Sequence, residues 1–362
     1  MRSIYVADVG DGVCINGRTI AGKSIQIDCG SLQGGRMGFE GLERTLCKAY
    51  GRSVFILSHF HIDHYNGLLY ASLASHHRWM RPPAIMEVYY PRIPDFKWKK
   101  EFILYLFTMN LRIFGSETGV MEYDFLKAVS RINDGKRFKY APVSQGGIID
   151  VNGAILEVLW PPMILEDKTA LSAVRRALED FKKALEEDKI TRQLYERVAQ
   201  SGVFEEYFED HWSTEESIQQ SDTYVHQRPE YRTKLPKVAI RANKSLREAA
   251  NHMGLALCRD NQVLFFGDLE DFEISEVVNH LRSKKRRNFH VVITPHHGTH
   301  WNESLRGIKC FYSVSSVGRR LCSKLDPRFK EISERSLATW VNGDIVLPMS
   351  LTGRILSRLL WW

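Results

Sequence analysis

The chain of 362 residues has the length of two average domains, or of one large domain that carries insertions. With 44% hydrophobic and 26% charged residues, it cannot be a mainly disordered or collagen-like chain. The formal net charge of +7 mildly favours an anionic partner without identifying nucleic acid. We expect no signal peptide and no membrane span, because no run approaches the roughly 18 apolar residues that a bilayer requires. Six scattered cysteines without a CxxC pair favour the reducing cytoplasm.

The first part of the chain is predicted to form mainly strands. Residues 1–68 alternate short β-type runs with Gly, Asp and Asn turns. Residues 95–135 are richer in aromatic and long apolar side chains, and we expect a helical insertion there. Strand character returns over residues 141–160, where Asn152-Gly153 has the composition of a two-residue type I′ hairpin turn.

A second helical insertion is predicted over residues 163–235. Its apolar residues recur at 3-4-3-4 spacing, which indicates an amphipathic helix: Leu171, Val174, Leu178, Phe181 and Leu185. We expect this stripe to pack against the domain itself or against a partner, either a second copy or another protein. After the insertion, residues 254–271 are typical of two strands joined by a turn, and residues 272–287 of a helix.

A dense group of polar residues follows the apolar run SVFIL. It places three histidines and one aspartate within six residues, namely His59, His61, Asp63 and His64. Imidazoles at positions i and i+2 of an extended segment point the same way, and neutral imidazole is a ligand for zinc, manganese or iron. The pattern therefore predicts a metal site, with Asp63 and His64 close enough to reach a second ion.

The segment HFHIDH resembles the HxHxDH signature of the metallo-β-lactamase superfamily. The other motifs of that superfamily occur in the same order, with Asp28 in SIQIDCG, Asp268 in VLFFGDLE and His297 in ITPHHGTH, where His296 is the alternative. The segments ADVGDG, SHFHIDHYNG, NHMGLAL and SVSSVG are similar to the ComEC-like branch, the soluble hydrolase domain of DNA-uptake channels. The channel-forming membrane region of those proteins is absent from this chain, so a role in DNA transport is not implied.

This resemblance implies an α/β fold, a four-layer αβ/βα sandwich formed by residues 1–362 as one domain with the two helical insertions. It also implies two divalent ions, Zn or Mn. The implied roles are as follows: His59 and His61 hold the first ion, Asp63, His64 and His297 hold the second, Asp268 bridges both, and Asp28 orients a ligand imidazole. Asp63 has the alternative role of orienting or deprotonating the attacking hydroxide.

Two parts of this site stay open at the level of the sequence. The remaining histidine of the first site has several candidates: His252, which we prefer, His226, His211 and the pair His76-His77. The relatives usually carry an Asn and a His-Pro pair after SVG, whereas this chain has Asp326 before Pro327, so a histidine that could donate a proton is missing. Asn251 and His300 are the candidates for that task.

The resemblance implies a metal-dependent phosphodiesterase acting on nucleic acid or nucleotides. The alternatives are hydrolysis of a carbon ester, lactone, thioester or amide by the same metal-activated water, and a binding module without turnover. Five cations near the end of the helix predicted over residues 272–287 either contact phosphates or complement the helix dipole: Arg282, Lys284, Lys285, Arg286 and Arg287. A groove leading from them to the metals would favour long nucleic acid, and a pocket roofed by the second insertion would favour a small nucleotide.

Overall fold

Two seven-stranded mixed sheets form the centre of the molecule. The computed structural model describes residues 1–46, 53–74, 85–118, 120–121, 125–133, 136–200, 225–226 and 235–349. The first sheet has the order β16-β1-β2-β3-β4-β5-β7, with β1 (Ser3–Val6), β2 (Ile15–Arg18), β3 (Ser24–Ile27), β4 (Ser53–Ile56), β5 (Ile85–Pro91), β7 (Lys139–Val143) and β16 (Ile345–Pro348). The second has the order β15-β14-β13-β12-β11-β9-β8, with β8 (Ile148–Val151), β9 (Ala154–Trp160), β11 (Ala256–Arg259), β12 (Val263–Phe265), β13 (Asn288–Ile293), β14 (Lys309–Ser315) and β15 (Ser333–Ala338).

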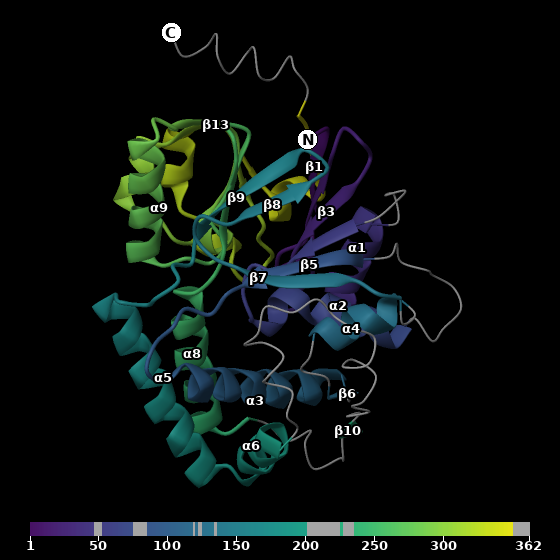
Figure 1. Ribbon diagram of the computed structural model, residues 1–362, viewed down its shortest axis with the longest axis vertical. Coiled ribbons are helices and arrows are strands. Elements are labelled where there is room, and N and C mark those ends of the chain that lie inside the picture. Colours follow the sequence, from purple (N-terminus) through teal and green to yellow (C-terminus); the bar gives the residue numbers. More distant parts are fainter. Residues whose placement is uncertain are drawn as a thin grey trace.

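Helices cover the outer faces of the sheets and one end of the molecule. The longer ones are α1 (Gly35–Leu46), α2 (Ile62–Ala74), α3 (Lys99–Thr118), α4 (Phe125–Ile132), α5 (Lys168–Glu187), α6 (Lys189–Gln200), α8 (Lys237–Asn251) and α9 (Asp271–Ser283), and α10 (Thr339–Asn342) is a single turn. In Figure 1, α9 lies on one side of the two sheets, α1 and α2 lie on the other, and α3, α5, α6 and α8 gather at one end. Two short strands, β6 (Val120–Met121) and β10 (Val225–His226), pair with each other. Within the described residues, no helix is long and apolar enough to span a bilayer.

Alternation along the strands directs neighbouring side chains into different cores, and the described residues form three large cores and one small core near the N-terminus. In β12, Val263 and Phe265 enter the core between the sheets, while Leu264 enters the core beneath α9. In β4, Val54 enters the core between the sheets, while Phe55 faces the helices on the other side. Because successive side chains of a strand point to opposite faces, the central strands β4 and β12 are covered on both faces, and all of their residues are buried. The layered α/β arrangement with two mixed sheets agrees with the expected fold class.

The hairpin expected at Asn152-Gly153 is present. It joins β8 to β9, which pair in antiparallel fashion from Ile148↔Glu157 to Val151↔Ala154. Asn152 has φ of 52° and Gly153 has φ of 78°, and a type I′ turn requires positive φ at both central residues.

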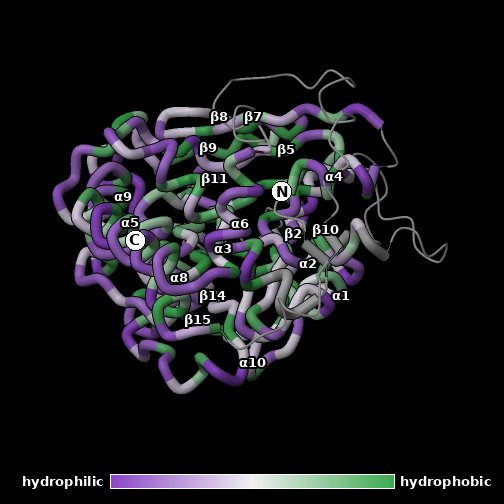
Figure 2. Tube along the Cα trace, turned by 90° about the horizontal axis from the view of Figure 1, so that it is seen from below, coloured by the Kyte–Doolittle hydropathy of each residue, from purple (hydrophilic) through white to green (hydrophobic). Residues whose placement is uncertain are grey.

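The helical segments occupy both predicted insertions, and the second segment extends beyond its predicted end. Helices α3 and α4 lie within residues 95–135, and α5 and α6 lie within residues 163–235. The predicted stripe of α5 packs within the chain, where Phe181 stacks on Tyr105 of α3 with ring centroids 4.1 Å apart. Helix α8 was not predicted, although its buried residues have helical spacing: Ala239, Ala242, Leu246, Ala249 and Ala250. Figure 2 views this end and shows hydrophilic outer turns around more hydrophobic strands.

The start of α5 depends on a side-chain cap. Asp167 accepts a hydrogen bond from the backbone N–H of Ala170 at 2.7 Å. We expect Asp167→Ala to lower the free energy of unfolding by about 1 kcal/mol, the usual cost of losing such a cap. Urea denaturation measures this change, and Glu166→Ala at the preceding exposed position is the control. Equal destabilisation by both substitutions would show that the cap contributes nothing.

Candidate metal centre

The predicted site residues lie where four strands end. Strands β3 and β4 run parallel in the first sheet, and β12 and β13 run parallel in the second. Asp28 follows β3, His59 follows β4, Asp268 follows β12 and His297 follows β13. The carboxyl ends of parallel strands share one edge of a sheet, so the two sheets present these four residues at a common edge of the sandwich.

A close backbone contact joins the turn after β3 to the start of α2. A Cβ atom added to Gly30 would lie 2.1 Å from the backbone oxygen of Asp63, so only glycine fits. Asp63 and His64 belong to the first turn of α2. The contact therefore brings the turn that carries Asp28 against the helix that carries His64.

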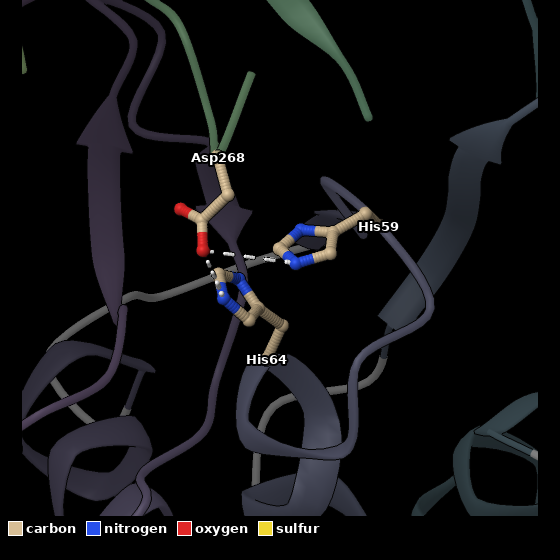
Figure 3. A group of neighbouring side chains, drawn as sticks. All are labelled: His59, His64 and Asp268. Carbon is tan, nitrogen blue, oxygen red and sulfur yellow. Dashed lines mark ion pairs between the residues drawn. The ribbon is translucent and has the colours of Figure 1, made fainter. Parts of the chain in front are cut away.

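Asp268 lies among three histidines. Its Oδ2 atom is 3.8 Å from His59 Nε2, 3.5 Å from His64 Nε2 and 3.5 Å from His297 Nε2. Figure 3 shows His59 and His64 directed at this carboxylate. Burial by itself would raise the pKa of Asp268, yet the neighbouring charge of His297 holds that pKa well below its usual range. The central position and the persistent charge of Asp268 are those required of a residue that contacts two ions.

Two buried sets of residues could each hold a metal ion. One consists of His59, His64 and Asp268, and the other of Asp63, His64 and His297, with the ligand atoms of each set within 4.8 Å of one another. The second set matches the expected ligands of the second ion. The first contains His64 where His61 was expected, but His61 Nδ1 lies only 2.7 Å from His59 Nε2 and belongs to the same cluster.

Three buried polar atoms of this cluster have no hydrogen-bond partner within the described part of the chain. They are Nε2 of His61, Oδ1 of Asp63 and Nε2 of His64. Buried polar atoms are nearly always paired, and each unpaired one costs about 1–3 kcal/mol. A cation accepts lone pairs from such atoms once they are deprotonated, so this group of unpaired atoms fits a metal centre better than a purely structural cluster.

The histidines differ in protonation. Burial lowers the pKa values of His59 and His61 well below the usual value, so both rings are neutral at pH 7, the form that binds metals. Burial also opposes a charge on His64, but the negative charges of Asp28 and Asp268 outweigh it and raise the pKa of His64 to about 10. A metal that binds His64 therefore has to displace a proton.

His64 and His297 are each oriented by an oxygen atom that contacts Nδ1, the ring nitrogen facing away from Asp268. Asp28 Oδ2 lies 2.8 Å from His64 Nδ1, which is the contact expected of Asp28, and Asp28 also accepts hydrogen bonds from the backbone N–H and the hydroxyl of Ser58. His297 Nδ1 lies 2.9 Å from the backbone oxygen of Ser316, in the SVSSVG segment. Because both Nδ1 atoms are engaged in this way, both Nε2 atoms point into the cluster.

The structure distinguishes between the two adjacent histidines of ITPHHGTH. His297 is buried beside Asp268 and belongs to the second set of ligands. His296 instead belongs to a separate group with Glu270 and His300. The preference for His297 over His296 therefore agrees with the geometry.

His252, the candidate that we preferred for the remaining ligand of the first site, lines a pocket together with His61, and its role as a ligand stays a prediction. His252 caps the end of α8, belongs to neither buried set, and its Nδ1 lies 2.7 Å from Glu273. Burial opposes protonation of His252, but Glu273 outweighs it and raises the pKa. The other candidates, His211, the pair His76-His77 and the side chain of His226, lie outside the described residues.

Arg247 is a site residue that sequence reasoning missed. Its Nη2 donates to Asp63 Oδ2 at 3.0 Å, and this charge keeps the pKa of Asp63 below its usual value although burial would raise it. Arg247 comes from α8, 184 residues away from Asp63. Helical spacing could have predicted α8, but it does not show which of the helix's cations faces a distant aspartate.

A pocket of about 660 Å³ opens beside the cluster between α5, α8 and the start of α9. Its lining includes His61, Arg176, Lys244, Arg247, Asn251 and His296. Asn251, one of the two candidates for contacting the substrate as a proton donor, lines this pocket and donates a hydrogen bond to Glu270 at 2.8 Å. Arg176 pairs with Glu248 at 2.7 Å, which leaves the wall mixed in charge.

The basic cluster of residues 282–287 does not reach the metal centre. It lies at the end of α9, whereas Asp268 precedes the start of that helix, and 13 residues of helix span about 20 Å. Arg286 pairs with Glu157 at 2.6 Å, and Lys284 contacts the same carboxylate. None of the five cations lines the pocket of 660 Å³. Of the two roles left open for these cations, complementing the helix dipole agrees with their position, whereas a contact with a substrate longer than this pocket stays a prediction.

Asp326, which stands where the resemblance would place a histidine, has a structural role. It caps the 3₁₀ helix Pro327–Glu331 by accepting from the backbone N–H of Arg328 at 2.9 Å. Its carboxylate also pairs with the guanidinium of Arg328 at 2.7 Å. Asp326 therefore does not replace the missing proton donor.

No protein-family model matches the chain, and the search of curated proteins finds no match to its sequence.

Proposed function

We propose that the protein is a metal-dependent phosphodiesterase of the metallo-β-lactamase superfamily that acts on nucleotides or nucleic acid. The observation that carries this proposal is the position of Asp268, whose Oδ2 lies 3.5 to 3.8 Å from ring nitrogens of His59, His64 and His297. Unpaired acceptor atoms on His61, Asp63 and His64 support it. The two sheets with helices on their outer faces agree with the αβ/βα sandwich of that superfamily.

The donor set fits two divalent ions, Zn or Mn. Imidazole and carboxylate are their usual ligands, and the proposed holders are His59 and His61 for one ion, Asp63, His64 and His297 for the other, and Asp268 for both. Such a pair of ions lowers the pKa of bound water toward neutrality and stabilises charge on both oxygens of an in-line displacement. Asp28 and the backbone oxygen of Ser316 keep the ligand rings oriented.

The pocket supports a small phosphorylated substrate. Its volume of about 660 Å³ is in the range of small-ligand sites, and helices α5 and α8 form its wall. Arg176, Lys244 and Arg247 supply cationic groups that suit phosphate, although Arg176 and Lys244 pair with Glu248 and Arg247 pairs with Asp63, so a phosphate has to compete with these carboxylates. A positive groove from the basic cluster to the metal centre was the main argument for long nucleic acid as the substrate. The basic cluster lies at the far end of α9, so this argument has no support. A nucleotide or a short oligonucleotide is therefore the favoured substrate.

The test is hydrolysis by metal-stripped protein refilled with Mn²⁺ or Zn²⁺. We expect ion-dependent turnover of bis(p-nitrophenyl) phosphate, and faster turnover of cyclic or dinucleotide substrates than of long DNA or RNA. Turnover of p-nitrophenyl acetate alone would favour the esterase alternative. Bound metal without any turnover would favour a binding module, and a protein that binds no metal would contradict the site assignment.

Arg247 is expected to bind the substrate phosphate. Hydrogen bonds to charged groups contribute about 1.5–3 kcal/mol, so Arg247→Ala should lower kcat/KM for bis(p-nitrophenyl) phosphate by about 10-fold to 100-fold. Arg247→Lys should retain part of this activity, because it keeps the charge but loses the two-pronged geometry. Lys237→Ala, at an exposed position at the start of α8, is the control. Equal kinetics for Arg247→Ala and the control would rule out this role.

A further inference from the structure

A second group of ligand-type side chains lies at the wall of the same pocket. It consists of Glu270, His296 and His300, whose ligand atoms all lie within 4.8 Å of one another. Glu270 stands directly before α9, and the two histidines belong to the loop after β13. None of the three is a member of the buried sets around Asp268. Glu270 and His296 line the pocket.

One atom of this group indicates a missing partner. His296 Nδ1 is buried and has no hydrogen-bond partner among the residues that the structure describes. The nearest carboxylate oxygen in an ion pair with it, Glu270 Oε1, is 3.8 Å away, which is too long for a hydrogen bond. A cation placed between these two atoms would satisfy both of them.

The neighbours of the group resemble the outer contacts of a metal site. His300 Nε2 lies 3.1 Å from Asp271 Oδ1, and a carboxylate on one ring nitrogen orients the other nitrogen toward an ion. Asn251 donates to Glu270 Oε1 at 2.8 Å, and a carboxylate has further lone pairs for a cation. Both contacts can persist when an ion is bound.

We propose that Glu270, His296 and His300 form a third cation site at the pocket wall, separate from the two proposed catalytic ions. Two imidazoles and one carboxylate are a donor set that binds Zn²⁺ and leaves a coordination position open. Because Glu270 and His296 face the pocket, that position is available to an anionic group of the substrate that does not react, such as a second phosphate. The role toward substrate rests on the proposed function, whereas cation binding does not.

The experiment counts ions rather than turnover. Metal-stripped protein is equilibrated with Zn²⁺, separated from free ion, and analysed by inductively coupled plasma mass spectrometry. We expect His300→Ala and Glu270→Gln each to hold one ion per chain fewer than the unsubstituted protein. His280→Ala is the matched control, because His280 lies near the other end of α9 and is similarly exposed. Circular dichroism establishes that each variant is folded.

The outcomes separate this site from the catalytic one. A metal count unchanged in both His300→Ala and Glu270→Gln would overturn the third site, whatever the activity. Loss of one ion in these variants from a protein without phosphodiesterase activity would support the third site and contradict the proposed function. As a further check, the double variant Asp268→Asn/His300→Ala should hold one ion per chain fewer than the single variant Asp268→Asn. The two sites share no ligand, so the loss at one site does not depend on the other.

Discussion

Asp268→Asn is expected to lower kcat/KM for bis(p-nitrophenyl) phosphate by at least about 100-fold. The substitution removes the negative charge that lies 3.5 Å from both His64 Nε2 and His297 Nε2. Loss of one partner from a buried group of charges costs about 3–5 kcal/mol, which corresponds to a factor of 100 to several thousand. Steady-state kinetics in saturating Mn²⁺, together with metal analysis, measure the effect.

A matched variant controls for loss of a carboxylate as such. Glu276→Gln makes the same change from acid to amide on the exposed face of α9 and should retain full activity. If Asp268→Asn kept more than about a tenth of the activity with its metals bound, the bridging role of Asp268 would be wrong.

Asp28→Asn is expected to weaken both metal binding and folding. Asp28 is fully buried and accepts three hydrogen bonds, from the backbone N–H of Ser58 at 2.7 Å, from its hydroxyl at 2.6 Å, and from His64 Nδ1 at 2.8 Å. When the amide nitrogen of an asparagine replaces Oδ2, two N–H donors face each other, one from the amide and one from Nδ1 of His64. The ring then has to carry its proton on Nε2, the atom that faces Asp268.

The expected size of this effect follows from both changes. Loss of a carboxylate behind a ligand histidine typically weakens metal binding by about 10-fold to 100-fold. Disruption of the buried pair lowers the free energy of unfolding by about 3 kcal/mol or more. Competition with a chelator measures the first quantity, and chemical denaturation of the metal-free protein measures the second.

Ser58→Ala provides a graded comparison for Asp28→Asn. It removes one donor to the Asp28 carboxylate and the hydroxyl contacts with Nδ1 of His59 and His64, but it leaves the contact between Asp28 and His64. We therefore expect a loss of about 1 kcal/mol in stability and a smaller loss of metal affinity than in Asp28→Asn. Equal metal affinity in Asp28→Asn and in the unsubstituted protein would show that His64 does not depend on Asp28 for its orientation.

Local patterns in the sequence were sufficient for several features. The turn at Asn152-Gly153 follows from two residues that tolerate positive φ, and the stripe of α5 follows from the period of a helix. The cluster from His59 to His64 is equally local, because its ligands are supplied within six residues of one loop and helix start. Each of these features depends on neighbours along the chain, so the sequence by itself determined them.

Only the tertiary structure decided which distant residues meet. Arg247 reaches Asp63 from α8, a helix that packs against α5 and α3, and no local pattern encodes a contact across 184 residues. The helix length of α9 separates the basic cluster from Asp268, although the two lie close in sequence. His296 and His297 are adjacent and chemically identical, yet the turn after β13 directs one toward Glu270 and the other toward Asp268. Periodicity specifies elements and their apolar faces, but the packing of those faces determines which polar side chains converge.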